Sequence, residues 1–250
     1  EAPHPPTTAA DWSERIGMRY RRLAAAAIRN EALRARYESI LQARVAVLRR
    51  ALMAPVPKNS AARDSVLAVG ERLMVPLLVG LLVDAGRCAQ AVDAVSLIRT
   101  DATHGAAAVN GPATQRRIRR WCAEHDGSIP VVPGFLGGTS DGGTTTLGRG
   151  GSDYSAALLA RGLEAERLER WTDVDGLYTS DPSENDGAQR LPEIEMDKAQ
   201  AWARDGRLGL HPRMLDPLAA AGIPLHVRCT HRPEGVGTQV VPGSAAEGVC

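Results

Sequence analysis

The chain has 250 residues, of which 44% are hydrophobic and 24% charged, and its basic and acidic side chains leave a formal net charge of +1. These values are ordinary for a globular protein with a sizeable core, and they argue against nucleic acid or an anionic membrane as a partner. The cysteines lie far apart and form no CxxC pair, so we expect no structural zinc site and a reduced, cytoplasmic protein. The longest apolar run, residues 75–83, is predicted to be too short to span a bilayer, and the first residues do not resemble a signal peptide.

The first third of the chain is predicted to be helical. Residues 1–10, rich in Pro and Thr, are expected to form a flexible leading segment. Residues 11–53 are dense in Ala, Leu, Arg and Glu, which predicts one long helix or a pair of helices. After the break at PVPKNS, Asp64 or Ser65 can cap a further helix that ends at Gly86, with a kink caused by Pro76.

From residue 89 onward, apolar strands alternate with helices. The predicted strands are 89–95, 129–135, 168–174, 224–230 and 237–241, and the predicted helices are 114–125, 152–165 and 210–222. His211 is expected to cap or pack the last of these helices. This alternation favours an α/β fold with a mostly parallel sheet sandwiched by helices. We expect one domain over residues 11–243 and a tail at 244–250.

The segment TTTLGRGGSDYSAALLA, residues 144–160, places an arginine and an aspartate among glycines at the start of a helix. In parallel sheets, ligands bind beyond the carboxyl ends of the strands, and helix N-termini attract anions. Arg149 could hold a carboxylate or phosphate through two hydrogen bonds, and Asp153 could cap the helix or face a bound cation or ammonium group. The alternative is a flexible surface loop with Ser152 as an ordinary N-cap.

A second polar turn, WTDVDGLYTSDP at residues 171–182, follows the next strand. Asp173 and Asp175 would stand at the carboxyl edge of the sheet. Taken alone, DVDG is equally typical of a plain β-turn. Two such loops after successive strands favour one composite site.

These two segments closely resemble the kinase domain of the aspartokinases, within the amino-acid kinase family. The resemblance extends to GERLMVPLL, LIRTDATHGAA and VVPGFLG, and to the closing stretch LHPRMLDPLAAAGIPLHVRCTHRPEGVGTQV, so it covers roughly residues 12–241. It implies the amino-acid kinase (carbamate kinase-like) fold. It also implies transfer of the γ-phosphoryl group of ATP, with Mg²⁺, to the side-chain carboxylate of aspartate or a similar amino acid.

The resemblance assigns roles to particular residues. Glu71 would bind the α-amino group of the amino acid, Arg149 would bind its α-carboxylate, and Asp153 would organise the catalytic centre. The other implied substrate-side residues are Gly150, Gly151 and Ser152, and the implied nucleotide-side residues are Thr172, Asp173, Tyr178 and Asp181. No metal site built by protein ligands alone is implied. A carboxylate acceptor is already ionised at pH 7, so the reaction needs alignment and charge neutralisation rather than a strong base.

The chain departs from the family pattern on its cationic side. The opening Lys-Phe-Gly-Gly-Thr-Ser of the family does not occur, so we expect an N-terminally truncated domain, which forms a homodimer or meets a partner chain that supplies this segment. No regulatory module is recognised after residue 241. Leu208 stands where a nucleotide-side lysine would be, Ser183 replaces an arginine, and Arg207 is expected to point elsewhere.

Each missing cation would slow phosphoryl transfer by about a hundred- to a thousandfold. A degenerate homologue is therefore the alternative hypothesis. Such a protein would keep an amino-acid pocket and act as a binding or regulatory subunit, or in repurposed chemistry of a specialised pathway. A third hypothesis is an interaction protein that uses the helical segment 11–53 as its surface.

Overall fold

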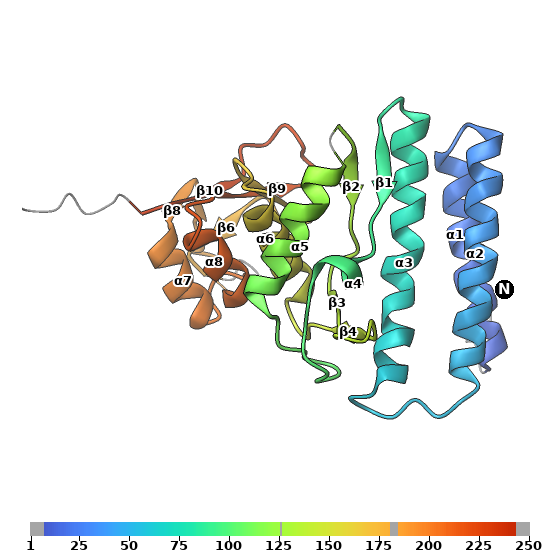
Figure 1. The fold of residues 1–250 in the computed structure, drawn as a ribbon. Helices are drawn as coiled ribbons and strands as arrows, with labels where there is room; N and C mark the ends of the chain where they lie inside the picture. The colour runs from blue at the N-terminus through green and yellow to red at the C-terminus, as the bar shows by residue number, and fades with distance from the viewer. Residues whose placement is uncertain (1–7, 126, 181–184, 244–250) are drawn as a thin grey trace, which may run out of the picture. The chain divides into compact units, whose positions relative to one another are not determined.

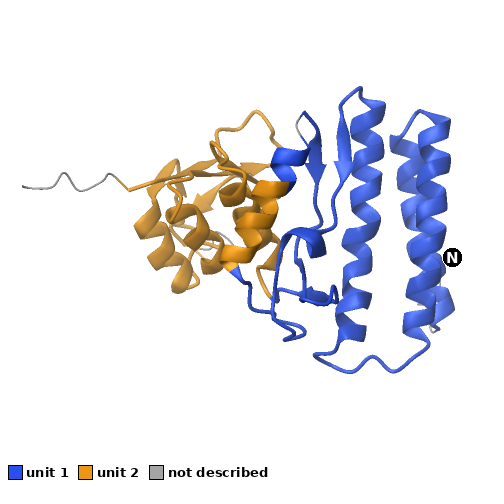
Figure 2. Ribbon diagram, in the orientation of Figure 1, with its two compact units in different colours: residues 1–110, 121–148 blue, residues 111–120, 149–250 orange. Residues whose placement is uncertain are grey.

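The computed structural model describes residues 8–125, 127–180 and 185–243. The chain divides into two compact units, shown in different colours in Figure 2. Unit 1 comprises residues 1–110 and 121–148, and unit 2 comprises residues 111–120 and 149–250. The division falls between Gly148 and Arg149, inside the glycine-rich segment, and it also crosses helix α5 (Gly111–Glu124).

Unit 1 begins with three long helices, α1 (Ala9–Ala27), α2 (Glu31–Leu52) and α3 (Ala61–Asp84) (Figure 1). The segment predicted as one helix or two is therefore a pair. The chain turns between α1 and α2, where the side chain of Asn30 accepts hydrogen bonds from the first N–H groups of α2 and acts as its N-cap. Leu41 and Leu73 are fully buried between these helices, so the helix layer has its own apolar core.

Helix α3 starts earlier than the sequence indicates. Its N-cap is Ser60, whose hydroxyl accepts from the Arg63 N–H at 3.2 Å, so the predicted caps Asp64 and Ser65 were wrong. The helix continues through Pro76 to Asp84. By length and composition alone it could cross a membrane, which corrects the expectation of a run too short to do so. However, its apolar residues contribute to the core of unit 1, and a core helix of this composition meets the same criteria.

Two small sheets complete unit 1. Strand β1 (Ala89–Ala91) pairs in parallel with β2 (Ile129–Val131). Residues 94 and 95 of the predicted strand 89–95 instead begin helix α4 (Ala94–Leu97), where Asp93 is the N-cap and accepts from the Val95 N–H. Strands β3 (Leu136–Gly138) and β4 (Thr144–Thr146) form an antiparallel hairpin inside a segment that the sequence predicts to be a glycine-rich loop.

Unit 2 contains a four-stranded sheet of order β5-β9-β10-β8, formed by Leu168–Thr172, Leu225–Cys229, Thr238–Val241 and Glu193–Glu195. The β5-β9 and β10-β8 pairs are parallel, and β9-β10 is antiparallel. A short antiparallel pair, β6 (Leu177–Tyr178) with β7 (Arg190–Leu191), stands apart from it. The predicted α/β class is confirmed, with a sheet that is mixed rather than wholly parallel.

Helices α6 (Gly151–Gly162), α7 (Met196–Arg204) and α8 (Pro212–Ala219) also belong to unit 2 (Figure 1). Leu215, Leu218 and Leu225 are fully buried at the centre of its core. The side chain of His211 caps α8 by accepting from the Arg213 N–H, as the sequence predicts. Helix α7 was not predicted.

Candidate functional site

The junction between the glycine-rich segment and α6 has a backbone conformation that requires glycine. Gly150 is the N-cap of α6 and lies in the left-handed region, with φ 68° and ψ 11°. A Cβ at this position would also lie 2.5 Å from the Cβ of His211. No side chain caps the first turn, so Ser152 is not the N-cap. The first N–H groups of α6 therefore have no side-chain cap, which is the arrangement that helix N-termini use to bind anions.

Two oppositely charged side chains flank this turn. Arg149 is exposed, and within the described part of unit 2 its guanidinium has no hydrogen-bond or ion-pair partner. Asp153, in the first turn of α6, accepts from the Arg170 Nε at 3.3 Å, and both of these side chains are about three-quarters buried, with exposures of 26% and 24%. Ser152, between them, is exposed. Arg149 is thus the cation that is free to meet a bound anion, whereas Asp153 is held by strand β5.

The second predicted turn follows β5 and is organised by hydrogen bonds to its carboxylates. The Thr172 hydroxyl donates to the Asp173 carboxylate at 3.0 Å and lowers the pKa of that carboxyl. The Tyr178 hydroxyl donates to Asp175 at 2.6 Å, and this hydrogen bond lowers the pKa of the Asp175 carboxyl. Asp181 lies outside the described residues, as does Ser183.

A small cavity of about 160 Å³ adjoins the second turn. Its lining residues are Asp175, Arg190, Cys229, Arg232, Gly235, Val236 and Gly237. Arg232 pairs with Asp175 at 3.0 Å, and Arg190 lies opposite Tyr178 in the β6-β7 register. The sequence analysis missed these two arginines, because only strand pairing and the turn after β9 bring them to Asp175. The cavity is smaller than a typical small-molecule site and could enclose only part of a nucleotide.

Leu208 and its neighbour Arg207 lie in different environments, the leucine in the core and the arginine at the surface. Leu208 is only 6% exposed and packs in the core of unit 2, so this position does not present a side chain to the solvent-facing turn. Arg207 is exposed, lies 4.2 Å over the Trp202 ring, and its Nη2 is 3.4 Å from the carbonyl oxygen of Thr179. Whether Arg207 points away from the nucleotide stays a prediction. Its charge stands beside the residue that follows Tyr178.

In unit 1, α3 carries the predicted ammonium-binding residue, Glu71. The Glu71 carboxylate is partly buried and has no hydrogen-bond partner among the described residues, and burial raises its pKa. The next residue, Arg72, donates to the Thr144 hydroxyl at 2.9 Å and pairs with Asp93 at 3.3 Å. Arg72 is therefore fixed to strand β4, whereas the Glu71 carboxylate remains able to accept a hydrogen bond from a ligand.

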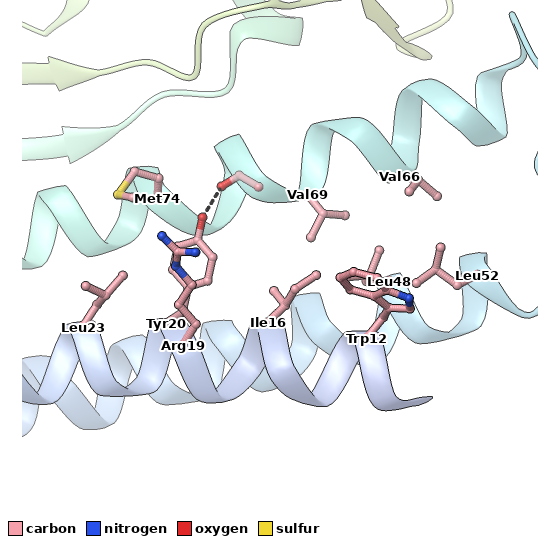
Figure 3. A pocket seen from close by; sticks show the side chains of 11 residues that line it. Trp12, Ile16, Arg19, Tyr20, Leu23, Leu48, Leu52, Val66, Val69 and Met74 are labelled. Atoms are coloured by element: carbon pink, nitrogen blue, oxygen red, sulfur yellow. Dashed lines mark hydrogen bonds between the residues drawn. The ribbon is translucent and has the colours of Figure 1, made fainter. Parts of the chain in front are cut away.

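A cavity of about 560 Å³ in unit 1 lies along the helix layer, and Glu71 is not among its lining residues (Figure 3). Apolar side chains such as Trp12, Leu48 and Met74 dominate its lining. Near its middle, the Tyr20 hydroxyl donates to the Gly70 carbonyl at 3.1 Å, which ties α1 to α3. None of the predicted site residues lines it, so it is not the candidate active site.

The residues that the structure describes contain no group of three or more His, Cys, Asp or Glu side chains arranged to hold a metal ion. This does not conflict with a nucleotide-bound Mg²⁺, which keeps several waters and needs only one or two protein carboxylates besides the phosphates.

The sequence model of the amino acid kinase family matches residues 15–229. Among curated proteins, the chain is 36% identical over 188 residues to lysine-sensitive aspartokinase 3 of Escherichia coli, covering 75% of this chain and 42% of the relative. It is 39% identical over 183 residues to an aspartokinase of Geobacillus stearothermophilus, covering 71% and 43%. The chain thus spans less than half the length of these relatives.

Solved structures give the same answer for the fold. The crystal structure of E. coli aspartokinase III in complex with aspartate and ADP, in its R-state, matches with a TM-score of 0.77 and 33% identity, covering 88% of this chain and 49% of that one. Clostridium acetobutylicum aspartate kinase matches with a TM-score of 0.72 over 95% of this chain and 48% of that one, and at 22% identity it supports the fold alone. The predicted fold is confirmed.

Proposed function

The chain belongs to the amino acid kinase family, with an aspartokinase-like kinase domain, and from that premise we propose that it transfers the γ-phosphoryl group of ATP to the side-chain carboxylate of aspartate or a similar amino acid. The observation that carries the proposal is the exposed Arg149, which has no hydrogen-bond or ion-pair partner in the described part of unit 2 and stands next to Gly150, at a turn that leads directly into α6, whose first turn has no side-chain cap. The similar E. coli structure was solved with aspartate and ADP, which supports this choice of substrates.

On the amino-acid side, we propose that Arg149 binds the α-carboxylate through two parallel hydrogen bonds. The backbone N–H groups of Gly150 and Gly151 and the Ser152 hydroxyl would contact the same substrate. Glu71 would bind the α-ammonium group. Burial already disfavours the ionised form of Glu71, so a cationic partner would offset that cost and favour binding of an ammonium group over a neutral one.

The chemical step joins an oxygen of the substrate's side-chain carboxylate to the γ-phosphorus of ATP and breaks the bond from that phosphorus to the bridging oxygen, so that ADP leaves. No proton has to be removed from the carboxylate at neutral pH. The protein's contribution is to align two anions and to stabilise the charge on the transferred group. On the nucleotide side we propose Thr172, Asp173, Tyr178 and Asp181, as the resemblance implies, supported by the charge of Arg207 beside that turn.

Mg²⁺ would accompany ATP and supply charge neutralisation on its phosphates. Asp153 is the carboxylate best suited to hold it, because this side chain is partly exposed at the first turn of α6 and is already oriented by Arg170. We further propose that the chain acts in the cytoplasm as a homodimer.

A degenerate homologue that binds an amino acid without transferring phosphate is the second candidate. The burial of Leu208 motivates it, because the position that resembles the family's nucleotide-side lysine lies in the core and carries no charge. The two candidates share the amino-acid pocket and differ in nucleotide binding and turnover.

The test is calorimetric titration of MgATP into the chain with and without L-aspartate, together with a coupled assay for ADP release. We expect aspartate-dependent ADP release that falls about a hundredfold or more in Arg149→Gln, since an anchoring cation is removed. The matched control is Arg167→Gln, an exposed arginine of the same unit whose one ion-pair partner among the described residues is Glu169, and it should leave activity unchanged. Aspartate binding without ATP binding or turnover would support the degenerate homologue, and the absence of binding by either ligand would refute both candidates.

A further inference from the structure

Asp64 is a buried carboxylate that the proposed chemistry does not use. Its side chain is 0% exposed in the first turn of α3, where the sequence suggested only a helix cap. Its Oδ1 accepts from the Thr146 hydroxyl at 2.6 Å, and its Oδ2 lies 2.7 Å from the His104 Nδ1. The Gly105 N–H approaches both oxygens, at 3.2 and 3.3 Å. A carboxylate is an acceptor with several lone pairs, so it can join three donors from two distant segments.

The two segments that Asp64 joins also contact each other. The Ala107 N–H donates to the Thr146 carbonyl at 2.9 Å, and the hydroxyls of Thr100 and Thr145 lie 2.7 Å apart in a buried hydrogen bond. A Cβ on Gly148 would come within 3.3 Å of the Gly105 carbonyl, so the backbones pass closely there. The 103–107 loop, together with Thr100 before it, and the 144–148 segment therefore form one layer, which is hydrogen-bonded to α3 through Asp64.

The strand end leads directly to the candidate site, because Gly148 is followed in the chain by Arg149. We propose that Asp64 is a positioning residue of the kinase reaction: it fixes the 144–148 segment and the 103–107 loop to α3, and thereby sets the starting point of the turn that carries Arg149. This inference rests on the proposed function for its catalytic consequence. Asp64 itself is fully buried, so it acts through Thr146 and the His104–Gly105 pair rather than by touching a substrate.

The chain offers a matched control on the same helix. Asp84, the last residue of α3, accepts from the backbone N–H groups of Arg29 at 2.7 Å and Asn30 at 3.1 Å. Like Asp64, it ties a remote loop to α3 through a carboxylate, but it does so at the other end of the helix. Asp84→Ala should therefore loosen the α1–α2 turn and leave the 103–107 and 144–148 segments unchanged.

The first experiment is amide hydrogen exchange on Asp64→Ala, Asp64→Asn and Asp84→Ala, because it needs no catalytic activity. We expect Asp64→Ala to speed exchange of the Gly105 and Ala107 amides about tenfold or more, as expected for loss of a local tie, with little change in α1 and α2. Asp64→Asn should rescue part of this protection, because the amide oxygen still accepts. Unchanged exchange at these amides, or an equal increase in Asp84→Ala, would overturn the proposal.

The second readout is kinetic. Asp64→Ala should raise the KM for aspartate about tenfold while leaving the KM for ATP within about twofold, because the displaced turn belongs to the amino-acid side. Faster local exchange with an unchanged KM for aspartate would overturn the positioning role. If wild-type chain neither binds nor phosphorylates aspartate, the proposed function fails, while the exchange data still decide whether Asp64 holds these segments.

Should Asp64→Ala not fold, Thr146→Val and Thr146→Ser give the same test with a smaller perturbation. Valine removes only the hydroxyl that donates to Asp64, and serine keeps it. The proposal requires faster exchange at Ala107 and a raised KM for aspartate in the valine variant, and near-normal behaviour in the serine variant. Equal behaviour of the two variants would overturn it.

Discussion

Replacing Gly150 with alanine tests whether the turn before α6 is built as described. Alanine at φ 68° must adopt the left-handed conformation, which costs about 1–2 kcal/mol for a residue with a Cβ. The new Cβ would also lie 2.5 Å from the Cβ and Cδ2 of His211. His211 must therefore move, and since its ring caps α8, the loss of that cap costs about 1 kcal/mol.

Together these effects give an expected destabilisation of about 2–3 kcal/mol, which is the range of a disrupted cap combined with backbone strain. Gly206→Ala separates the two causes. Gly206 lies in the same unit with φ +74°, and an added Cβ there would meet nothing within 4 Å. This control should lose only the backbone strain, about 1–2 kcal/mol, and therefore about 1 kcal/mol less than Gly150→Ala; any effect of alanine on the unfolded chain is common to both variants.

The assay is urea unfolding of the wild type and both variants, followed by circular dichroism, with the slopes compared to check that the same surface unfolds. Gly150→Ala should also lose aspartate affinity, whereas Gly206→Ala should not. If the two variants were destabilised equally, within about 0.5 kcal/mol, the close contact between Gly150 and His211 would be refuted.

Three further substitutions test the remaining features. Leu208→Lys should destabilise the protein by about 3 kcal/mol or more in urea unfolding, because it buries a charge in the core, and should not strengthen ATP binding; gain of ATP affinity in a stable variant would contradict the buried position. Glu71→Gln should raise the melting temperature at pH 7 and abolish aspartate binding. Burial raises the pKa of Glu71, so the ionised form of this side chain is the costly one. The stability gain should therefore vanish at a pH below the ordinary glutamate pKa, where the side chain at position 71 is uncharged in both proteins. Equal melting temperatures at pH 7 would refute this. Tyr178→Phe should cost about 1 kcal/mol at pH 7 by removing the hydrogen bond to Asp175. That bond lowers the pKa of Asp175, so its contribution is present above the unfolded pKa and is lost as the pH falls through the folded one, and a pH-independent loss would argue against it.

Some elements could be predicted because their determinants lie close together in the sequence. His211 followed by Pro212 caps α8 within one turn, and the prediction of that cap is confirmed. The α6 helix was found because small and aliphatic residues follow a glycine-rich turn, although the sequence did not indicate that Gly150 rather than Ser152 is its N-cap. The β3-β4 hairpin was missed, because its glycines have low strand propensity and packing against α3 and α4 overrides it.

The sequence by itself determined which residue types are available at the candidate site: an arginine and an aspartate at a turn that only glycine can form, and a second turn rich in Asp, Thr and Tyr. The tertiary structure alone decided which way the remaining side chains face. It buried Leu208 and brought Arg207 to Thr179, and it joined Asp64 to Thr146 across 82 positions of sequence. The physical reason is the separation along the sequence over which each determinant acts. Caps, turns and hydrophobic periodicity act over a few residues, whereas burial and the partners of a carboxylate depend on the packing of segments that are remote in the chain.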